Sequence, residues 1–138
     1  MLFPKKVKYR KWQTKRKNPN KVGLATRGNK VSMGSFGLKT LESARIRSYQ
    51  IEAARRVISR TVGKMGKVWI RIFPDRPYTQ KGAETPMGKG KGDVQGYEVP
   101  VLPGRILFEV DGVKEEIAQK ALKKAGAKLP VKIKVVSR

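Results

Sequence analysis

The sequence predicts a single α+β domain, with a mostly antiparallel sheet and two helices, preceded by an extended basic N-terminal arm. Two stretches repeat apolar residues at helical spacing, and several short runs are rich in β-branched and aromatic residues. The first 41 residues carry twelve Lys or Arg and no acid. Because so many like charges repel and cannot all find partners within the chain, we expect an arm over residues 1–30 and one domain over residues 31–138.

Each helix is predicted from its apolar spacing and its glycine stop. The first is expected over residues 48–62, ending at Gly63 and Gly66, and the second over 114–125, ending at Gly126. Their expected buried positions are Ile51, Ala54, Ile58 and Val62 in the first, and Ile117, Ala118, Ala121, Leu122 and Ala125 in the second. Strands are expected at residues 23–27, 30–36, 67–73, 94–102, 105–110 and 131–136.

A long connection over residues 74–93 is expected to be a loop, and loops of this length in a compact domain are usually functional. It contains Met87-Gly88-Lys89-Gly90-Lys91-Gly92. The motif argues against a nucleotide-binding loop, because Gly90 stands where Ser or Thr would hold magnesium and no helix follows to face a pyrophosphate. We favour a flexible cationic finger that inserts into a nucleic-acid crevice, with a disordered surface loop as the alternative.

The charge of the chain predicts an external polyanion as its partner. There are 33 basic and 10 acidic residues, so the formal net charge is +23 and the pI is near 10.8. Neutralised phosphates release counterions, so binding should weaken steeply as salt rises. Tyr9 and Trp12 lie among the cations and can stack on bases. We therefore expect a nucleic acid, with RNA ahead of DNA.

The same composition argues against other classes of protein. The chain has no Cys and no His, which removes thiol nucleophiles, disulfides, the usual zinc sites and the commonest general base. Glu115 and Glu116 are adjacent in a predicted helix, where neighbouring side chains do not face one another. No apolar run approaches the ~20 residues that span a bilayer. We expect no enzyme, no metal, no cofactor and no membrane partner.

The first predicted helix also carries a candidate phosphate-binding face. Arg55, Arg56 and Arg60 project away from its apolar stripe, and Arg45 and Arg47 precede it. A solvated charged face is the ordinary interpretation of such a pattern. Since only Glu52 is available to balance these arginines, we favour phosphate binding, for which the planar guanidinium is well suited.

Several motifs occur in an order that resembles one known family over nearly the whole chain. They are Met1-Leu-x-Pro-Lys5, Ser35-Phe-Gly-Leu38, Gln50-Ile-Glu-Ala-Ala-Arg-Arg56, Gly66-Lys-Val-Trp-Ile-Arg-Ile-Phe-Pro-Asp75, Met87-Gly-Lys-Gly-Lys-Gly92, Gly104-Arg-Ile-Leu-Phe-Glu109 and Lys128-Leu-Pro130. Together they resemble the bacterial large-subunit ribosomal protein sixteen family. The chain is therefore identified as similar to a ribosomal protein.

The resemblance implies an α/β hammerhead-type fold and a permanent place in the large subunit near the central protuberance. It implies binding to large-subunit rRNA beside the peptidyl-transferase region, contact with acceptor-site tRNA, with the peptidyl site as a second candidate, and late entry into subunit assembly. Neighbouring ribosomal proteins are the expected protein partners, and no homo-oligomer is expected. The expected location is the ribosome, in the cytoplasm or in an organelle's stroma or matrix if the chain is organelle-encoded.

Carried over by position, the resemblance assigns residues to two RNAs. The arm residues Lys5, Lys6, Lys8, Arg10 and Lys11 would contact RNA, Arg55 and Arg56 would lie against rRNA, and Lys89 and Lys91 would face the tRNA-binding region. Two departures bear on the loop: Pro86 stands where the family commonly has Arg, and Gly82-Ala83 replaces a more usual Pro-containing stretch. The loop's RNA contacts are therefore expected to differ from those of the family.

Two other functions stay open at this point. A free-standing nucleic-acid-binding protein, such as an RNA chaperone or a DNA-compacting protein, would share the charge but has no reason to carry the ordered motifs. An enzyme using residues 74–93 as a lid would need an acid–base constellation that the sequence does not offer. A structural ribosomal protein is the favoured interpretation.

Overall fold

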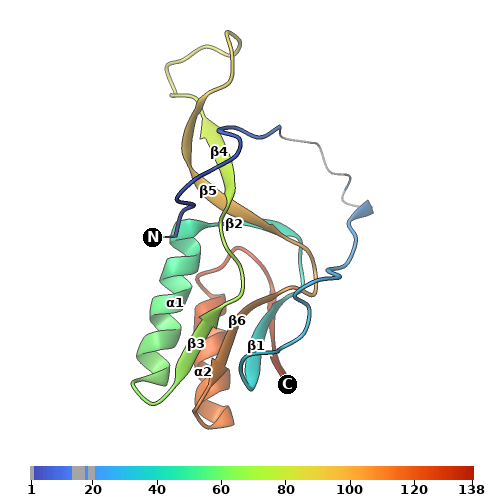
Figure 1. Ribbon diagram of the computed structural model, residues 1–138, viewed down its shortest axis with the longest axis vertical. Helices are drawn as coiled ribbons and strands as arrows, with labels where there is room; N and C mark the ends of the chain where they lie inside the picture. The colour runs from blue at the N-terminus through green and yellow to red at the C-terminus, as the bar shows by residue number, and fades with distance from the viewer. Residues whose placement is uncertain (1, 14–17, 19–20) are drawn as a thin grey trace.

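The computed structural model describes residues 2–13, 18 and 21–138, and within them the chain forms two antiparallel sheets and two helices (Figure 1). The elements are β1 Phe36–Thr40, β2 Ala44–Arg47, α1 Ser48–Val62, β3 Lys67–Ile70, β4 Arg76–Gln80, β5 Asp93–Val101, β6 Ile106–Asp111, α2 Glu115–Gly126 and β7 Ile133–Ser137. The expected α+β class is confirmed. No helix among the described residues is long and apolar enough to cross a membrane.

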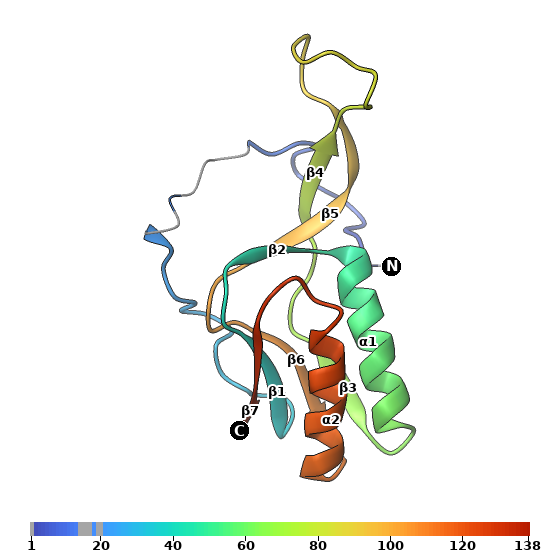
Figure 2. The same ribbon diagram turned by 180° about the vertical axis from the view of Figure 1, so that it is seen from behind.

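The body of the protein is a four-stranded sheet packed against both helices. Its strand order is β3-β6-β1-β7, with every neighbouring pair antiparallel. Helices α1 and α2 pack on each other, α1 also on β3, and α2 on β1 and β7 (Figures 1 and 2). Strand β6 lies in the interior of the sheet and buries residues 106–110 completely or almost so. This arrangement makes β6 the centre of the core.

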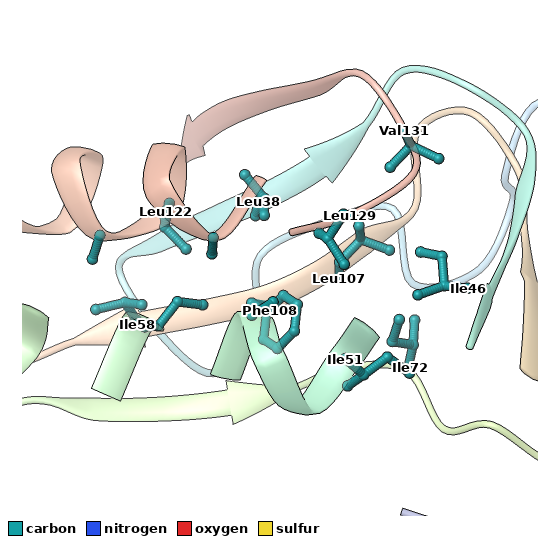
Figure 3. Close-up of a cluster of buried hydrophobic side chains, with 14 of the residues drawn as sticks. Leu38, Ile46, Ile51, Ile58, Ile72, Leu107, Phe108, Leu122, Leu129 and Val131 are labelled. Atoms are coloured by element: carbon teal, nitrogen blue, oxygen red, sulfur yellow. The ribbon is translucent and has the colours of Figure 1, made fainter. Parts of the chain in front are cut away.

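The core confirms the apolar stripe predicted for α1. Ile51 and Ile58 of α1 belong to the same buried cluster as Phe108 of β6 and Leu122 of α2, and Ile51 lies beside Ile72 (Figure 3). Ala54 and Val62 are buried with them, as the helical spacing required. In α2 four of the five expected positions are buried, but Ile117 is 39% exposed. The prediction for Ile117 is wrong because this residue lies at the edge of the stripe, in the first turn of the helix.

A second, three-stranded sheet carries a hairpin away from the body. Its order is β2-β5-β4, and the long strand β5 pairs with both neighbours. The β4–β5 hairpin projects beyond the helices, with residues 81–92 at its tip (Figures 1 and 2). The segment 74–93, predicted as one loop, therefore contains β4. Prolines at 74, 77 and 86 hid this strand in the sequence, since proline removes a ladder donor.

The strands predicted at residues 23–27 and 30–36 are absent from the structure. The first strand begins only at Phe36, and the preceding segment is held by buried side chains instead of a ladder. Glu109 accepts hydrogen bonds from the backbone N–H groups of Ser32 (2.6 Å) and Met33 (3.1 Å). Gly34 lies so close to β6 that an added Cβ would meet the Val110 carbonyl oxygen at 2.7 Å. These contacts satisfy the backbone without regular strand geometry.

The remaining strand predictions differ in their boundaries. The expected strand over 67–73 ends at Ile70, although the Arg71 N–H still donates to the Leu107 carbonyl at 2.9 Å. Strand β2 was not predicted at all, because Ala44–Arg47 alternates small and cationic residues in a run of only four. The sequence Asn18-Pro19-Asn20 is typical of a turn, but residues 19 and 20 lie outside the described part of the chain, as do the basic residues 15–17.

Candidate nucleic-acid interface

The described part of the N-terminal arm lies along the β4–β5 hairpin (Figure 1). Leu2 packs against the hydrophobic core at one end of this segment. At the other end the Arg76 guanidinium of β4 lies 5.8 Å from the centre of the Trp12 ring, and Arg76 Nη2 donates to the Gln13 carbonyl at 3.5 Å. Residues 2–13 are therefore fastened to the body at both ends without regular secondary structure.

The arm also meets the glycine–lysine loop, which we define as residues 81–92. The Lys11 Nζ donates to the Lys91 carbonyl oxygen at 3.5 Å, and the Lys91 Nζ donates to the Trp12 carbonyl oxygen. Two segments that lie far apart in the sequence thus touch each other through their lysines. Lys5, Lys6 and Arg10 are exposed along the same arm. Lys8 lies 5.5 Å from the centre of the Tyr9 ring, which is itself 62% exposed.

The glycine–lysine loop has a defined backbone path. Gly88, Lys89 and Gly90 have φ angles of 101°, 56° and 98°, a run of left-handed conformations that only glycine adopts readily. The Lys81 Nζ donates to the Gly88 carbonyl oxygen, and the Thr85 N–H donates to the Gly82 carbonyl at 3.0 Å. Residues 82–91, Met87 among them, are all exposed. The loop therefore presents Lys89 and Lys91 on a low, open backbone.

Three arginines lie at the base of the hairpin. Arg45 and Arg76 share one carboxylate, and Arg47 contacts two tyrosines. Glu98 of β5 is nearly buried and lies 3.8 Å from Arg45 Nε and 3.9 Å from Arg76 Nε. Arg47 stacks 4.5 Å from the centre of the Tyr78 ring and donates to the Tyr49 hydroxyl at 3.1 Å. The hydrogen bond with Tyr49 is the main cause that raises the pKa of Arg47. Arg45 is thus partly neutralised, whereas Arg47 keeps its charge in a fixed position.

Helix α1 presents its arginines with less free charge than the sequence implied. Glu52 accepts from Arg55 Nε at 3.0 Å and from Arg55 Nη2, and lies 3.5 Å from Arg56 Nε. The hydrogen bond with Arg55 is the main cause that lowers the pKa of Glu52, and it raises the pKa of Arg55. Arg60, in the last turn, is exposed and forms no ion pair within 4.0 Å among the described residues. Of this face, Arg60 and the outer edge of Arg56 remain open to a phosphate.

The structure therefore separates the predicted site residues into two groups. The arm and the loop come together at the hairpin, and Arg45 and Arg47 lie at its base. Arg55, Arg56 and Arg60 lie along α1. Sequence reasoning missed Arg76 and Lys81, which hold the arm and shape the loop, because both fell in a segment interpreted as unstructured. The cation–aromatic pattern Arg76-Pro-Tyr78 was the signal that could have revealed a strand there.

The uncompensated cations define what this site can do. Among the residues that the structure describes, no carboxylate lies within 4.0 Å of the amino groups of Lys5, Lys6, Lys11, Lys89 or Lys91. Such a surface attracts extended anions, and its exposed aromatic rings suit stacking on bases. The fold and the site together define the class of protein: a basic α+β protein with a cationic surface on its arm and hairpin tip.

Comparisons with known proteins agree with this class and assign a family. Residues 4–136 match the sequence model of the family described as ribosomal protein L16p/L10e. Relatives named large ribosomal subunit protein uL16 are 54% identical in Halorhodospira halophila, 53% in Azobacteroides pseudotrichonymphae and 52% in Francisella tularensis subsp. novicida. Each match covers 100% of this chain and 94–98% of the relative. The chain belongs to the ribosomal protein L16p/L10e family.

Proposed function

We propose that this protein is a structural, non-catalytic component of the large ribosomal subunit. It binds large-subunit rRNA beside the peptidyl-transferase region and contacts tRNA in the acceptor site, with the peptidyl site as a second candidate. The relatives named above are large-subunit proteins by name, which supports the assignment to the subunit. The structural observation that supports the proposal best is a set of lysines on the arm and the hairpin tip. Among the described residues, no carboxylate lies within 4.0 Å of their amino groups.

The shape of the molecule supports a division of labour between its parts. The helices and the four-stranded sheet form a stable body, and the β4–β5 hairpin places its tip away from that body (Figure 2). Lysines on such a projection reach an RNA surface that the bulky body cannot approach. Neutralising phosphates there reduces repulsion between RNA segments and holds their geometry, which is the way a non-catalytic protein supports subunit assembly and tRNA placement.

The test is sedimentation of cell lysate through sucrose gradients at moderate and high salt, with the protein followed by a tag. We expect it to stay with the large subunit after a high-salt wash and to be released by RNase. Migration with DNA, or release into light fractions at moderate salt, would contradict the proposal and favour the free-standing nucleic-acid-binding protein.

A matched pair of variants locates the interface. Replacing Lys5, Lys6 and Lys8 by Gln removes three arm cations, and replacing Lys120, Lys123 and Lys124 by Gln removes three from α2 at equal cost in net charge. We expect the arm variant to leave the subunit at lower salt than the α2 variant. Equal release of both variants would show that retention depends on net charge alone.

A further inference from the structure

Lys11 and Lys91 are 80 residues apart in sequence, yet each ammonium group reaches the backbone of the other's segment. Lys11 Nζ donates to the Lys91 carbonyl, and Lys91 Nζ donates to the Trp12 carbonyl beside Lys11. An ammonium group has three donors, so each lysine keeps two donors after this exchange. These two contacts tie the described part of the arm to the tip of the β4–β5 hairpin, along which the arm runs (Figure 1).

The charges around this crossing are not balanced within the described chain. No carboxylate lies within 4.0 Å of either ammonium group among the described residues. Arg76 adds a third cation nearby, although it lies 3.9 Å from Glu98. Asp75 and Asp93 are exposed neighbours of the arm and of the loop, and neither forms an ion pair with any residue that the structure describes. Two ammonium groups held together repel each other unless an anion lies between them.

The surroundings leave room for that anion. Gly90 and Gly92 flank Lys91, so the loop backbone carries no side chain on either side of it. Residues 88–91 are all exposed to solvent. Trp12 is 39% exposed and follows Lys11 directly, so a nucleotide whose phosphate reached the lysines could rest its base or ribose against this ring.

We propose that Lys11 of the arm and Lys91 of the glycine–lysine loop hold one RNA phosphate between them. This rests on the proposed function and deepens it, because it joins one residue of the arm and one of the loop into a single site for one phosphate. The negative charge of the shared phosphate offsets the repulsion between the two ammonium groups and so holds the arm against the loop. One nucleotide then sets the position of both segments.

The experiment counts neutralised phosphates. Binding of a single-stranded oligouridylate is measured over a range of salt concentrations for the wild-type chain, Lys11→Gln, Lys91→Gln and the double variant. Gln keeps an N–H donor for the backbone carbonyl and removes only the charge. For a single strand, each neutralised phosphate contributes about 0.7 to the slope of log affinity against log salt. Thermal melts of all four chains establish that each is folded.

The outcomes separate cleanly. If the two lysines share one phosphate, either lysine alone still neutralises it, so each single variant keeps nearly the wild-type slope and the double variant loses about 0.7. If they bind separate phosphates, each single variant loses about 0.7 and the double variant loses about 1.4. That result overturns the proposal, as does an unchanged slope in the double variant. Retention of the wild-type chain on the subunit is an independent measurement, so the proposed function can stand when this inference fails.

A control addresses the mechanical link between arm and loop. Lys89→Gln removes a charge two residues from Lys91 but has no contact with the arm among the described residues. Combined with Lys11→Gln, it should reduce the slope additively, because the two lysines then act on different phosphates. A non-additive result for this pair would show that coupling comes from the loop as a whole, and would also overturn the proposal.

Discussion

Arg71 and Glu109 form a buried ion pair in which Nη1 lies 3.2 Å from Oε2, and the Glu109 side chain is completely inaccessible to solvent. Arg71 also donates to the Ser32 hydroxyl, while Glu109 accepts from the backbone of Ser32 and Met33. This pair therefore fastens the segment before β1 to the centre of the sheet. The charge of Arg71 is thus matched inside the fold, in contrast to the open lysines of the arm.

Glu109→Ala should destabilise the fold by about 3 kcal/mol, because it leaves the Arg71 charge and two backbone donors without their acceptor. Urea unfolding followed by circular dichroism measures the change. Glu84→Ala, in the exposed loop, is the matched control and should leave the free energy of unfolding nearly unchanged. Equal stability of the two variants would show that the buried pair contributes nothing net.

Ile58→Asp should prevent stable folding, because it places a carboxylate at a fully buried position between α1 and β6. The expected loss is more than about 4 kcal/mol, as for an unpaired buried charge. Ser59→Asp, one residue along and exposed, is the control and should cost less than about 1 kcal/mol. A native-like thermal melt of Ile58→Asp would mean that the apolar stripe of α1 is misplaced.

Replacing Lys89 and Lys91 by Ala should leave the protein folded and weaken tRNA binding by reconstituted subunits by about tenfold at physiological salt. Both lysines are exposed at the hairpin tip, so their loss removes charge without opening the core. Lys123 and Lys124 replaced by Ala in α2 remove the same charge and should leave tRNA affinity unchanged. Equal tRNA affinity of both double variants would end the idea that the loop faces tRNA.

Glu52→Gln should reduce stability in a manner that depends on pH. The hydrogen bond from Arg55 lowers the pKa of Glu52 from its ordinary value of 4.5, so the pair stabilises the fold above that value. The contribution is lost as the pH falls through the lowered pKa. Because Arg55 is 39% exposed, solvent screening limits the effect to about 0.5 kcal/mol. Urea titrations at a series of pH values measure the free energy of unfolding of the wild type and of Glu52→Gln. The difference between the two should vanish in acid, and a difference that stays constant with pH would contradict this prediction.

Much of the body could be predicted from sequence because its signals are local. The buried face of α1 follows from the spacing of Ile51, Ala54, Ile58 and Val62, which repeats within one helix and needs no knowledge of its partners. Strand β4 could not be predicted in this way. Its ladder depends on pairing with β5 across the hairpin, and that pairing lies outside any local window.

The site shows the same division. The excess of positive charge and the lack of Cys and His, both visible in the sequence alone, predicted a polyanion as partner and left none of the usual thiol or imidazole groups for catalysis. Which cations are paired was decided by the tertiary structure: Arg45 meets Glu98 and Arg71 meets Glu109, whereas Arg55 and Glu52 are neighbours three residues apart in one helix. The charge of a residue is a property of its chemistry, whereas its partner is a property of where the fold places it. For the same reason, only the folded chain brought Lys11 to Lys91.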